Sequence, residues 1–297
     1  MRARPPSQDD RRKHASLSSF KRPQPAWAKA VYSFMNTSQA NTPQTASRNY
    51  YVRSLARGLS VLSSFTPDSP VQTVSRVAAM TGLDRAGVRR MLRTLEALGY
   101  VHREGPKFHL TPRVLDLAYI YLSTTPLCYV AEPVLEKLVS VVHESCSASV
   151  LDGSEMVFVV RVPAHKIMSI NLAIGSRLPA YCTSAGRILL GDLSKEGLDR
   201  ALKASAITKH TKYTVTSIPE LKRIVRRDHQ RGWSLLSQEL EEGVCALSVP
   251  IVDRTGRIIA AMNVAGSLSR TTPGKMISTV LPRLKHAARE MKSLLLG

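Results

Sequence analysis

Acidic residues are scarce in this sequence. Its 297 residues include 22 Asp and Glu against 42 Lys and Arg, which gives a formal net charge of +20 at pH 7. So large a positive excess favours a polyanionic partner, most simply nucleic acid. Charge alone does not identify that partner, because basic proteins of other classes exist.

Cysteines and long apolar runs are scarce as well. The four cysteines (Cys128, Cys146, Cys182, Cys245) lack the close pairs of a zinc site and the regular spacing of a secreted disulfide scaffold. No apolar run approaches the roughly 18–20 residues that cross a bilayer, and no hydrophobic segment follows the N-terminal arginines. We therefore expect a cytoplasmic protein with reduced thiols, no metal site and no membrane association.

Motifs for catalysis are also missing. The sequence contains no G-x-S-x-G, G-x-x-x-x-G-K-[ST], G-x-G-x-x-G or H-E-x-x-H pattern. An enzyme would have to use Cys182 or Ser184 as its nucleophile, yet none of the eight histidines stands in a recognisable partner motif. We expect a protein that is not an enzyme and that binds no cofactor.

Residues 1–48 differ in composition from the rest of the chain. They carry nine Lys and Arg but two Asp, and they are rich in Pro, Ser, Gln and Asn. With few aliphatic residues to bury, such a segment cannot offset the entropy lost on ordering, so it is predicted to be a disordered basic arm. An organelle transit peptide is an alternative that Asp9 and Asp10 disfavour, and a misassigned start codon would leave a similar stretch.

Residues 49–111 have the pattern of a winged helix-turn-helix. Three helical segments are expected in "SLARGLSVLSSF", "VSRVAAM" and 84–98, with Ala78 and Gly82 suited to the close approach and turn between the last two. Asp84 is placed to cap the third helix. A strand, a Gly-Pro turn and a second strand follow in "YVHREGPKFHLT". This order predicts a DNA-binding domain.

The helix over 84–98 has two unlike faces. Val88, Met91, Leu92, Leu95 and Leu98 are expected on the buried side, whereas four arginines project from the other. A solvated helix face would usually mix both signs of charge, but no carboxylate occurs between positions 85 and 95. The helix is therefore predicted to enter the major groove, where arginine can bind guanine bidentately. Predicted base contacts are Arg85, Arg89 and Arg90, with Arg93 on phosphate. Four further basic residues either contact phosphate or the minor groove at the edges of the domain, or are plain surface charges. They are Arg53, Arg57, Arg103 and Lys107.

The remainder of the chain predicts an α+β domain behind a linker helix. Residues 112–126 form a helix that is apolar over much of its surface and suggests contact with a second subunit. Over 127–297 strands and helices alternate as in a mostly antiparallel sheet flanked by helices, with "IMSINLAI" as one strand. Thr183, Ser184, Ala185 and Gly186 stand at a strand-to-helix junction. Backbone N–H groups there would hold a carboxylate, or the segment is an ordinary N-cap with close packing.

From Tyr50 to the C-terminus the sequence resembles the IclR family of bacterial transcriptional regulators. The resemblance rests on "SLARGLSVLSSF", "MTGLDRAGVRRMLRTLEALGYV", "FHLTPRVLDL", "GSRLPAYCTSAGRILL" and "QELEEGVCALSVPIVDRTGRIIAAMNVAG". It implies a winged helix-turn-helix, a dimerising linker helix and a GAF-like effector-binding domain, in a homodimer or homotetramer. The wording of "RAGVRRMLRTLEALGYV" is most similar to the branch that regulates aromatic-acid catabolism through the β-ketoadipate pathway.

The resemblance also implies a set of effector-binding positions. They fall on Ser184 and Ala185, on Leu236 or Ser237, and on Ala246, Asn263 and Ala265, while Arg187 stands where the family signature has lysine. Leu236, Ala246 and Ala265 replace residues that are commonly polar in the family. With Ile167 and Ile170 as further apolar walls, the pocket suits an aromatic or β-ketoadipate-like acid better than a small keto acid of the glyoxylate type.

The leading hypothesis is a transcription factor that binds a double-stranded DNA operator and responds to a small organic acid. Effector binding in 127–297 would favour one dimer geometry and so change the spacing of the two recognition helices. One alternative is an architectural DNA-binding protein without a ligand, although a second domain of about 170 residues exceeds what that role needs. The other is an enzyme whose C-terminal domain acts on a small acid.

Overall fold

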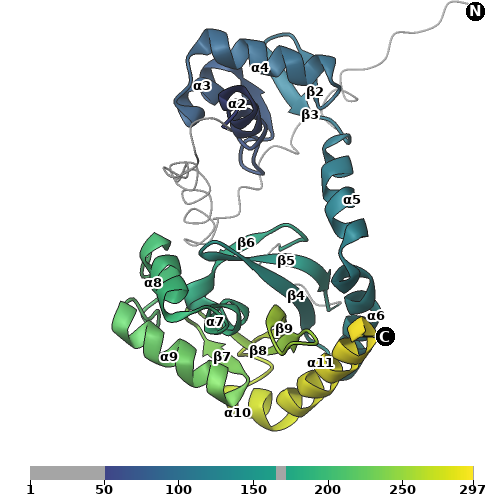
Figure 1. Cartoon of the computed structure of the whole chain (residues 1–297), viewed down its shortest axis with the longest axis vertical. Helices are drawn as coiled ribbons and strands as arrows, with labels where there is room; N and C mark the ends of the chain where they lie inside the picture. The colour runs from purple at the N-terminus through teal and green to yellow at the C-terminus, as the bar shows by residue number, and fades with distance from the viewer. Residues whose placement is uncertain (1–50, 165–171, 297) are drawn as a thin grey trace, which may run out of the picture.

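The computed structural model describes residues 51–164 and 172–296. The predicted basic arm and two predicted effector residues, Ile167 and Ile170, lie outside this range. Figure 1 shows a small unit of helices and a hairpin, a larger unit built on a sheet, and α5 running between them.

The small unit contains three helices and a three-stranded antiparallel sheet of order β1-β3-β2. Its elements are α2 (Arg53–Leu62), β1 (Val71–Thr73), α3 (Val74–Thr81), α4 (Arg85–Ala97), β2 (Val101–Glu104) and β3 (Lys107–Leu110). The helices and the hairpin match the prediction, whereas β1 was not expected. The core of the unit is formed by side chains from α2, α3, α4 and the hairpin, namely Val61, Val77, Val88, Leu92, Val101 and Phe108.

The turn between α3 and α4 is built as the sequence predicts. Gly82 adopts φ +68°, in the left-handed region that glycine enters at little cost, and it ends α3. Asp84 then caps α4, its Oδ1 accepting a hydrogen bond of 2.7 Å from the amide of Gly87. These two residues set the angle at which α4 leaves α3.

Apolar residues are not all buried where helical spacing suggested. Leu98 is 53% exposed, so its expected place on the buried side of α4 was wrong, because it lies at the C-cap where the helix ends. Leu55 and Leu59 are also exposed, while Val61 is buried. The regularly spaced leucines of α2 therefore form an apolar face that is exposed to solvent.

Two helices lead into the larger unit, α5 (Val114–Thr124) and α6 (Pro126–Val142). Before α5, the Thr111 hydroxyl donates a 2.5 Å hydrogen bond to the carbonyl of Gly99 and accepts one of 3.3 Å from the amide of Arg113. No residue of α5 is buried. Within the described residues no single helix is long and apolar enough to cross a membrane; α5 and α6 reach that length only as a pair bent by 83°.

The larger unit is built on a six-stranded sheet of order β6-β5-β4-β9-β8-β7, in which every neighbouring pair is antiparallel. Its strands are β4 (Ser145–Asp152), β5 (Glu155–Val162), β6 (Arg177–Pro179), β7 (Ser234–Ser237), β8 (Val244–Val252) and β9 (Ile258–Ser267). The strand expected in "IMSINLAI" falls largely on residues outside the described range, and its described end, 172–174, is not a strand. The short strand β6 was not expected.

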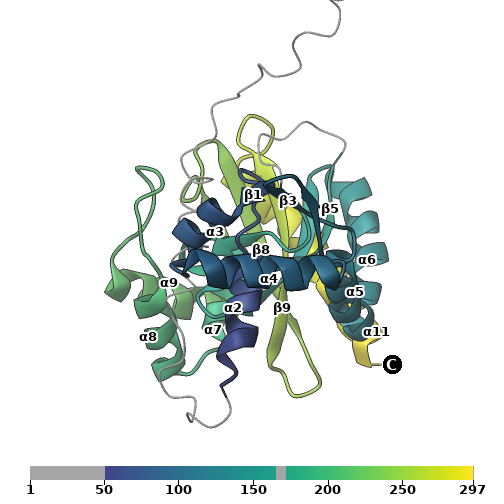
Figure 2. The same cartoon turned by 90° about the horizontal axis from the view of Figure 1, so that it is seen from above.

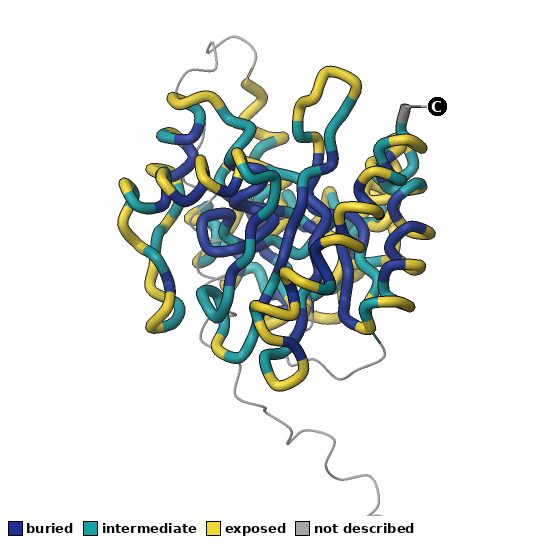
Figure 3. Tube along the Cα trace, turned by 90° about the horizontal axis from the view of Figure 1, so that it is seen from below, coloured by how far each residue is buried: buried dark blue, intermediate teal, exposed yellow. Residues whose placement is uncertain are grey.

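Helices cover both faces of this sheet. They are α7 (Ser184–Gly191), α8 (Lys195–Ala204), α9 (Ile218–Arg231), the short α10 (Pro273–Lys275) and α11 (Leu281–Leu296). α6 and α11 pack on one face, and α7 packs on the other beside α8 and α9 (Figure 1). The strands lie in the buried interior while the outward faces of the helices are exposed (Figure 3).

Candidate functional site

The predicted recognition helix lies across the outer end of the small unit (Figure 2). Arg85, Arg89, Arg90 and Arg93 are all exposed on α4. Within the described residues no ion pair involves the first three, whereas Arg93 contacts Glu96 at 3.0 Å. Three guanidinium groups therefore remain available to an external anion.

The other predicted DNA contacts surround α4. Arg53 and Arg57 are exposed on α2, which packs against α4, and Lys107 is exposed at the hairpin. Arg103 lies on β2, where its Nε is 3.6 Å from Glu96, so part of its charge is already compensated. Contact of any of these side chains with DNA stays a prediction.

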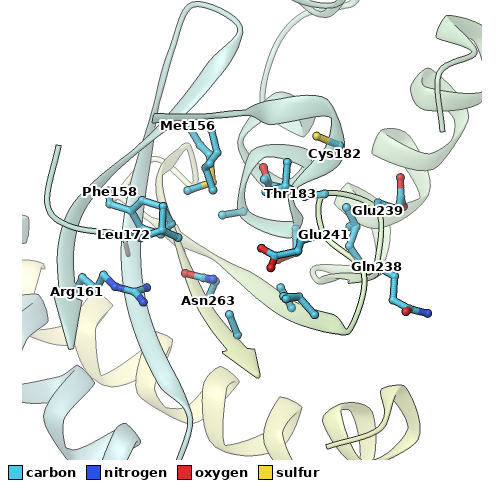
Figure 4. A pocket seen from close by; sticks show the side chains of 18 residues that line it. Met156, Phe158, Arg161, Leu172, Cys182, Thr183, Gln238, Glu239, Glu241 and Asn263 are labelled. Atoms are coloured by element: carbon cyan, nitrogen blue, oxygen red, sulfur yellow. The ribbon is translucent and has the colours of Figure 1, made fainter. Parts of the chain in front are cut away.

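A second candidate site is a cavity in the larger unit, between the sheet and the start of α7, whose space, with the part open to solvent included, is about 650 Å³ (Figure 4). Its walls are mainly apolar. The predicted effector positions that line it are Ser184, Ala185, Leu236, Ala246, Asn263 and Ala265. Ser237 does not line it, because successive side chains on a strand point to opposite faces and Leu236 is the one that faces inward.

A row of polar residues crosses the sheet beside this cavity, and two of its members, Arg161 and Asn263, line the cavity. Arg161, Ser147, Asn263 and Ser248 are register partners on the adjacent strands β5, β4, β9 and β8. Ser147 donates a hydrogen bond to the side-chain oxygen of Asn263. Because neighbouring strands are about 4.8 Å apart, Arg161 and Asn263 start roughly 10 Å from each other.

The polar lining includes residues that the sequence did not single out. Arg161, Gln238 and Glu241 all line the cavity. Figure 4 shows the Glu241 carboxylate and the Asn263 amide near its middle. The sequence could have marked Arg161 as a candidate site residue, because it is the only charged residue within the apolar strand "MVFVVRV".

The start of α7 has the N-cap and close packing that were one of the two alternatives for 183–186. Thr183 Oγ1 accepts a hydrogen bond of 3.2 Å from the amide of Gly186, and a side chain at Gly186 would overlap the backbone of Ala180. The Ser184 hydroxyl lies 2.7 Å from that of Ser248, which joins α7 to the polar row. The same residues line the cavity, so the carboxylate-binding alternative stays open.

Arg187, in the family's lysine position, does not line the cavity. Its guanidinium forms a two-pronged ion pair with Glu239, with N···O distances of 2.8 and 2.7 Å, and its Nε donates to the carbonyl of Tyr181 at 2.8 Å. Arg187 is 2% exposed. The pair fixes the segment 238–241, which lines the cavity, against α7.

The two candidate nucleophiles are not activated. Burial raises the pKa of the Cys182 thiol to about 12, so it stays protonated at neutral pH. Ser184 has Ser248 as its hydroxyl partner where a nucleophile would need a base. Within the described residues no group of three or more His, Cys, Asp and Glu could hold a metal ion.

Comparison with known proteins gives matches to both units. The family model "IclR helix-turn-helix domain" matches residues 54–105, and "Bacterial transcriptional regulator IclR C-terminal" matches 119–293. The Pca regulon regulatory protein of Pseudomonas putida is 35% identical over 83% of this chain and 85% of its own length. The p-hydroxybenzoate hydroxylase transcriptional activator of Acinetobacter baylyi is 34% identical over 82% and 92%.

A solved structure with a bound ligand has the same fold. The homolog from Microbacterium hydrocarbonoxydans, complexed with 4-hydroxybenzoate, superposes with a TM-score of 0.70 and 25% identity, covering 82% of this chain and 98% of its own. The predicted winged helix-turn-helix and antiparallel α+β architecture is confirmed by these matches and by the strand order.

Proposed function

Because the chain belongs to the IclR family of bacterial transcriptional regulators, we propose that an aromatic or β-ketoadipate-like acid bound in the cavity controls its affinity for an operator. The observation that carries this proposal is the cavity itself, whose exposed surface is mainly apolar and whose polar groups include Arg161, Ser184 and Asn263. Pockets of this kind bind small organic ligands and orient them through those few polar groups. The relatives named for p-hydroxybenzoate hydroxylase and bound to 4-hydroxybenzoate support an aromatic acid.

The DNA-binding part of the proposal rests on α4. Its N-terminal arginines read base edges in the major groove, and the flanking basic residues contact phosphates. Such a regulator acts in the cytoplasm, where its operator lies. Nothing in the chemistry of Cys182 or Ser184 favours an enzyme over this function.

Addition of an aromatic acid effector to the full chain is expected to raise its melting temperature and to change its operator affinity. A ligand at a hundred times its Kd stabilises the folded state by about 2.7 kcal/mol. Differential scanning fluorimetry over a panel of hydroxybenzoates and aliphatic dicarboxylates measures the first effect. Fluorescence anisotropy of labelled operator DNA measures the second.

The same panel separates the alternatives. An architectural DNA-binding protein would show no thermal shift with any acid. An enzyme would convert one of them, with turnover lost in Cys182→Ala or Ser184→Ala. Either outcome would replace the proposal.

We infer that the exposed face of α5 is covered by a second copy of the chain. Five apolar side chains on this helix are between 46% and 70% exposed, namely Leu115, Leu117, Tyr119, Ile120 and Tyr121. An exposed apolar face of this kind marks a protein interface, and the family resemblance indicates dimerisation through this helix.

Ile120→Ala is expected to weaken dimerisation about tenfold, because it removes apolar area that the dimer buries. Sedimentation velocity across a concentration series measures the dimer dissociation constant. Ile259→Ala, at an exposed isoleucine outside α5, is the matched control and should leave the constant unchanged. A wild-type chain that stays monomeric at all concentrations would refute the inference.

A further inference from the structure

Arg161 is an uncompensated cation in an apolar cavity. It lies at one end of the polar row, and within the described residues no carboxylate forms an ion pair with it; its guanidinium carbon is 5.8 Å from the ring centre of Phe158. Burial lowers the pKa of Arg161 below the ordinary value for a guanidinium. A partly buried charge is costly unless it is paired, so this position is prepared for an anion.

Glu241 gives the cavity a second charged group of opposite sign. Figure 4 shows its carboxylate directed into the cavity on the far side of Asn263 from Arg161. A carboxylate accepts hydrogen bonds from hydroxyl groups but repels a second carboxylate brought close to it. The cavity therefore has a cationic end and an accepting end.

Building on the proposed function, we propose that Arg161 binds the carboxylate of the effector and that Glu241 accepts a hydrogen bond from a hydroxyl group on its ring. The cavity then selects a hydroxylated aromatic monocarboxylate and rejects dicarboxylates, including those of the β-ketoadipate type. Arg161 and Asn263 start roughly 10 Å apart on the sheet, and Figure 4 shows Glu241 beyond Asn263, so the two charged groups lie in separate parts of the cavity. The apolar walls, which include Phe158, Leu172 and Leu236, cover its faces.

The start of α7 is the competing anchor for the carboxylate, because backbone amides at Ser184 and Ala185 border the same cavity. The two anchors can be distinguished by substitution of Arg161. If the backbone amides held the carboxylate, the affinity for the effector would not depend on the side chain at position 161.

The first test compares 4-hydroxybenzoate with 4-hydroxybenzamide, which has the same shape but no charge. Isothermal titration calorimetry on the full chain gives the dissociation constant of 4-hydroxybenzamide divided by that of 4-hydroxybenzoate. In Arg161→Met this ratio is expected to fall about tenfold, the effect of one charge-assisted hydrogen bond, and in Arg161→Lys it should fall less. Lys285→Met, at an exposed site on α11, should keep the wild-type ratio.

The second test compares 4-hydroxybenzoate with terephthalate, in which a carboxylate replaces the ring hydroxyl. The wild type should prefer 4-hydroxybenzoate, and Glu241→Gln should reduce that preference about tenfold, because an amide can donate to a carboxylate. Unchanged ratios in both variants, with 4-hydroxybenzoate still bound, would overturn this inference and leave the proposed function intact. A wild type that binds no aromatic acid would overturn both.

Discussion

Replacement of Arg187 by methionine is expected to lower the free energy of unfolding by about 3–5 kcal/mol, the usual cost of removing one partner from a buried ion pair. Methionine keeps the apolar stem but leaves Glu239, whose side chain is 12% exposed, without its cation. It also removes the bond from Arg187 to the carbonyl of Tyr181. Urea unfolding of the full chain, followed by circular dichroism, measures the change.

Two further variants show whether burial is the cause. Arg223→Met breaks an ion pair with Glu220 whose side chains are 64% and 40% exposed, and it should lower the free energy of unfolding far less than Arg187→Met does. Adding Glu239→Gln to Arg187→Met should recover part of the loss, because the amide removes the unpaired charge. An Arg187→Met variant no less stable than Arg223→Met would contradict the conclusion that the buried pair of Arg187 and Glu239 stabilises the fold.

Local patterns in the sequence were sufficient for the helices, the turn and the hairpin of the small unit. The positions of Gly82 and Asp84 predict the turn and the cap, since both features depend on residues within three or four positions of each other. The strands β1 and β6 were missed because each is three residues long and exists only through pairing with β3 or β5. No periodicity can be read from so short a segment.

The candidate effector site was partly predictable for a different reason. Ser184 stood out at a strand-to-helix junction, whereas Asn263 came from the family resemblance alone, which carries tertiary information that one sequence lacks. Arg161 was missed because its place in the cavity depends on the register of β5 against β4 and β9. The pair of Arg187 and Glu239 was missed because 52 positions separate its members, and no local pattern records which distant carboxylate a buried arginine meets.

Arg89→Ala is expected to weaken binding to the specific operator by about 1–3 kcal/mol, or roughly fivefold to 150-fold, and to affect random duplexes much less. The physical reason is that a guanidinium on the exposed face of α4, without an ion pair inside the described residues, is free to bind a base edge in the groove. Phosphate contacts add affinity of equal size on every sequence, so their loss does not discriminate. Fluorescence anisotropy with operator and scrambled duplexes at several salt concentrations measures both affinities.

Two controls separate base reading from simple loss of charge. Lys107→Ala, at the hairpin, should weaken operator and scrambled duplexes about equally and reduce the slope of log K against log salt by about one. Arg226→Ala removes an exposed arginine from α9 in the other unit and should change neither affinity. If Arg89→Ala behaves like Lys107→Ala, with equal losses on both duplexes, then Arg89 contacts the phosphate backbone and sequence must be read by Arg85 and Arg90, the remaining unpaired arginines of α4.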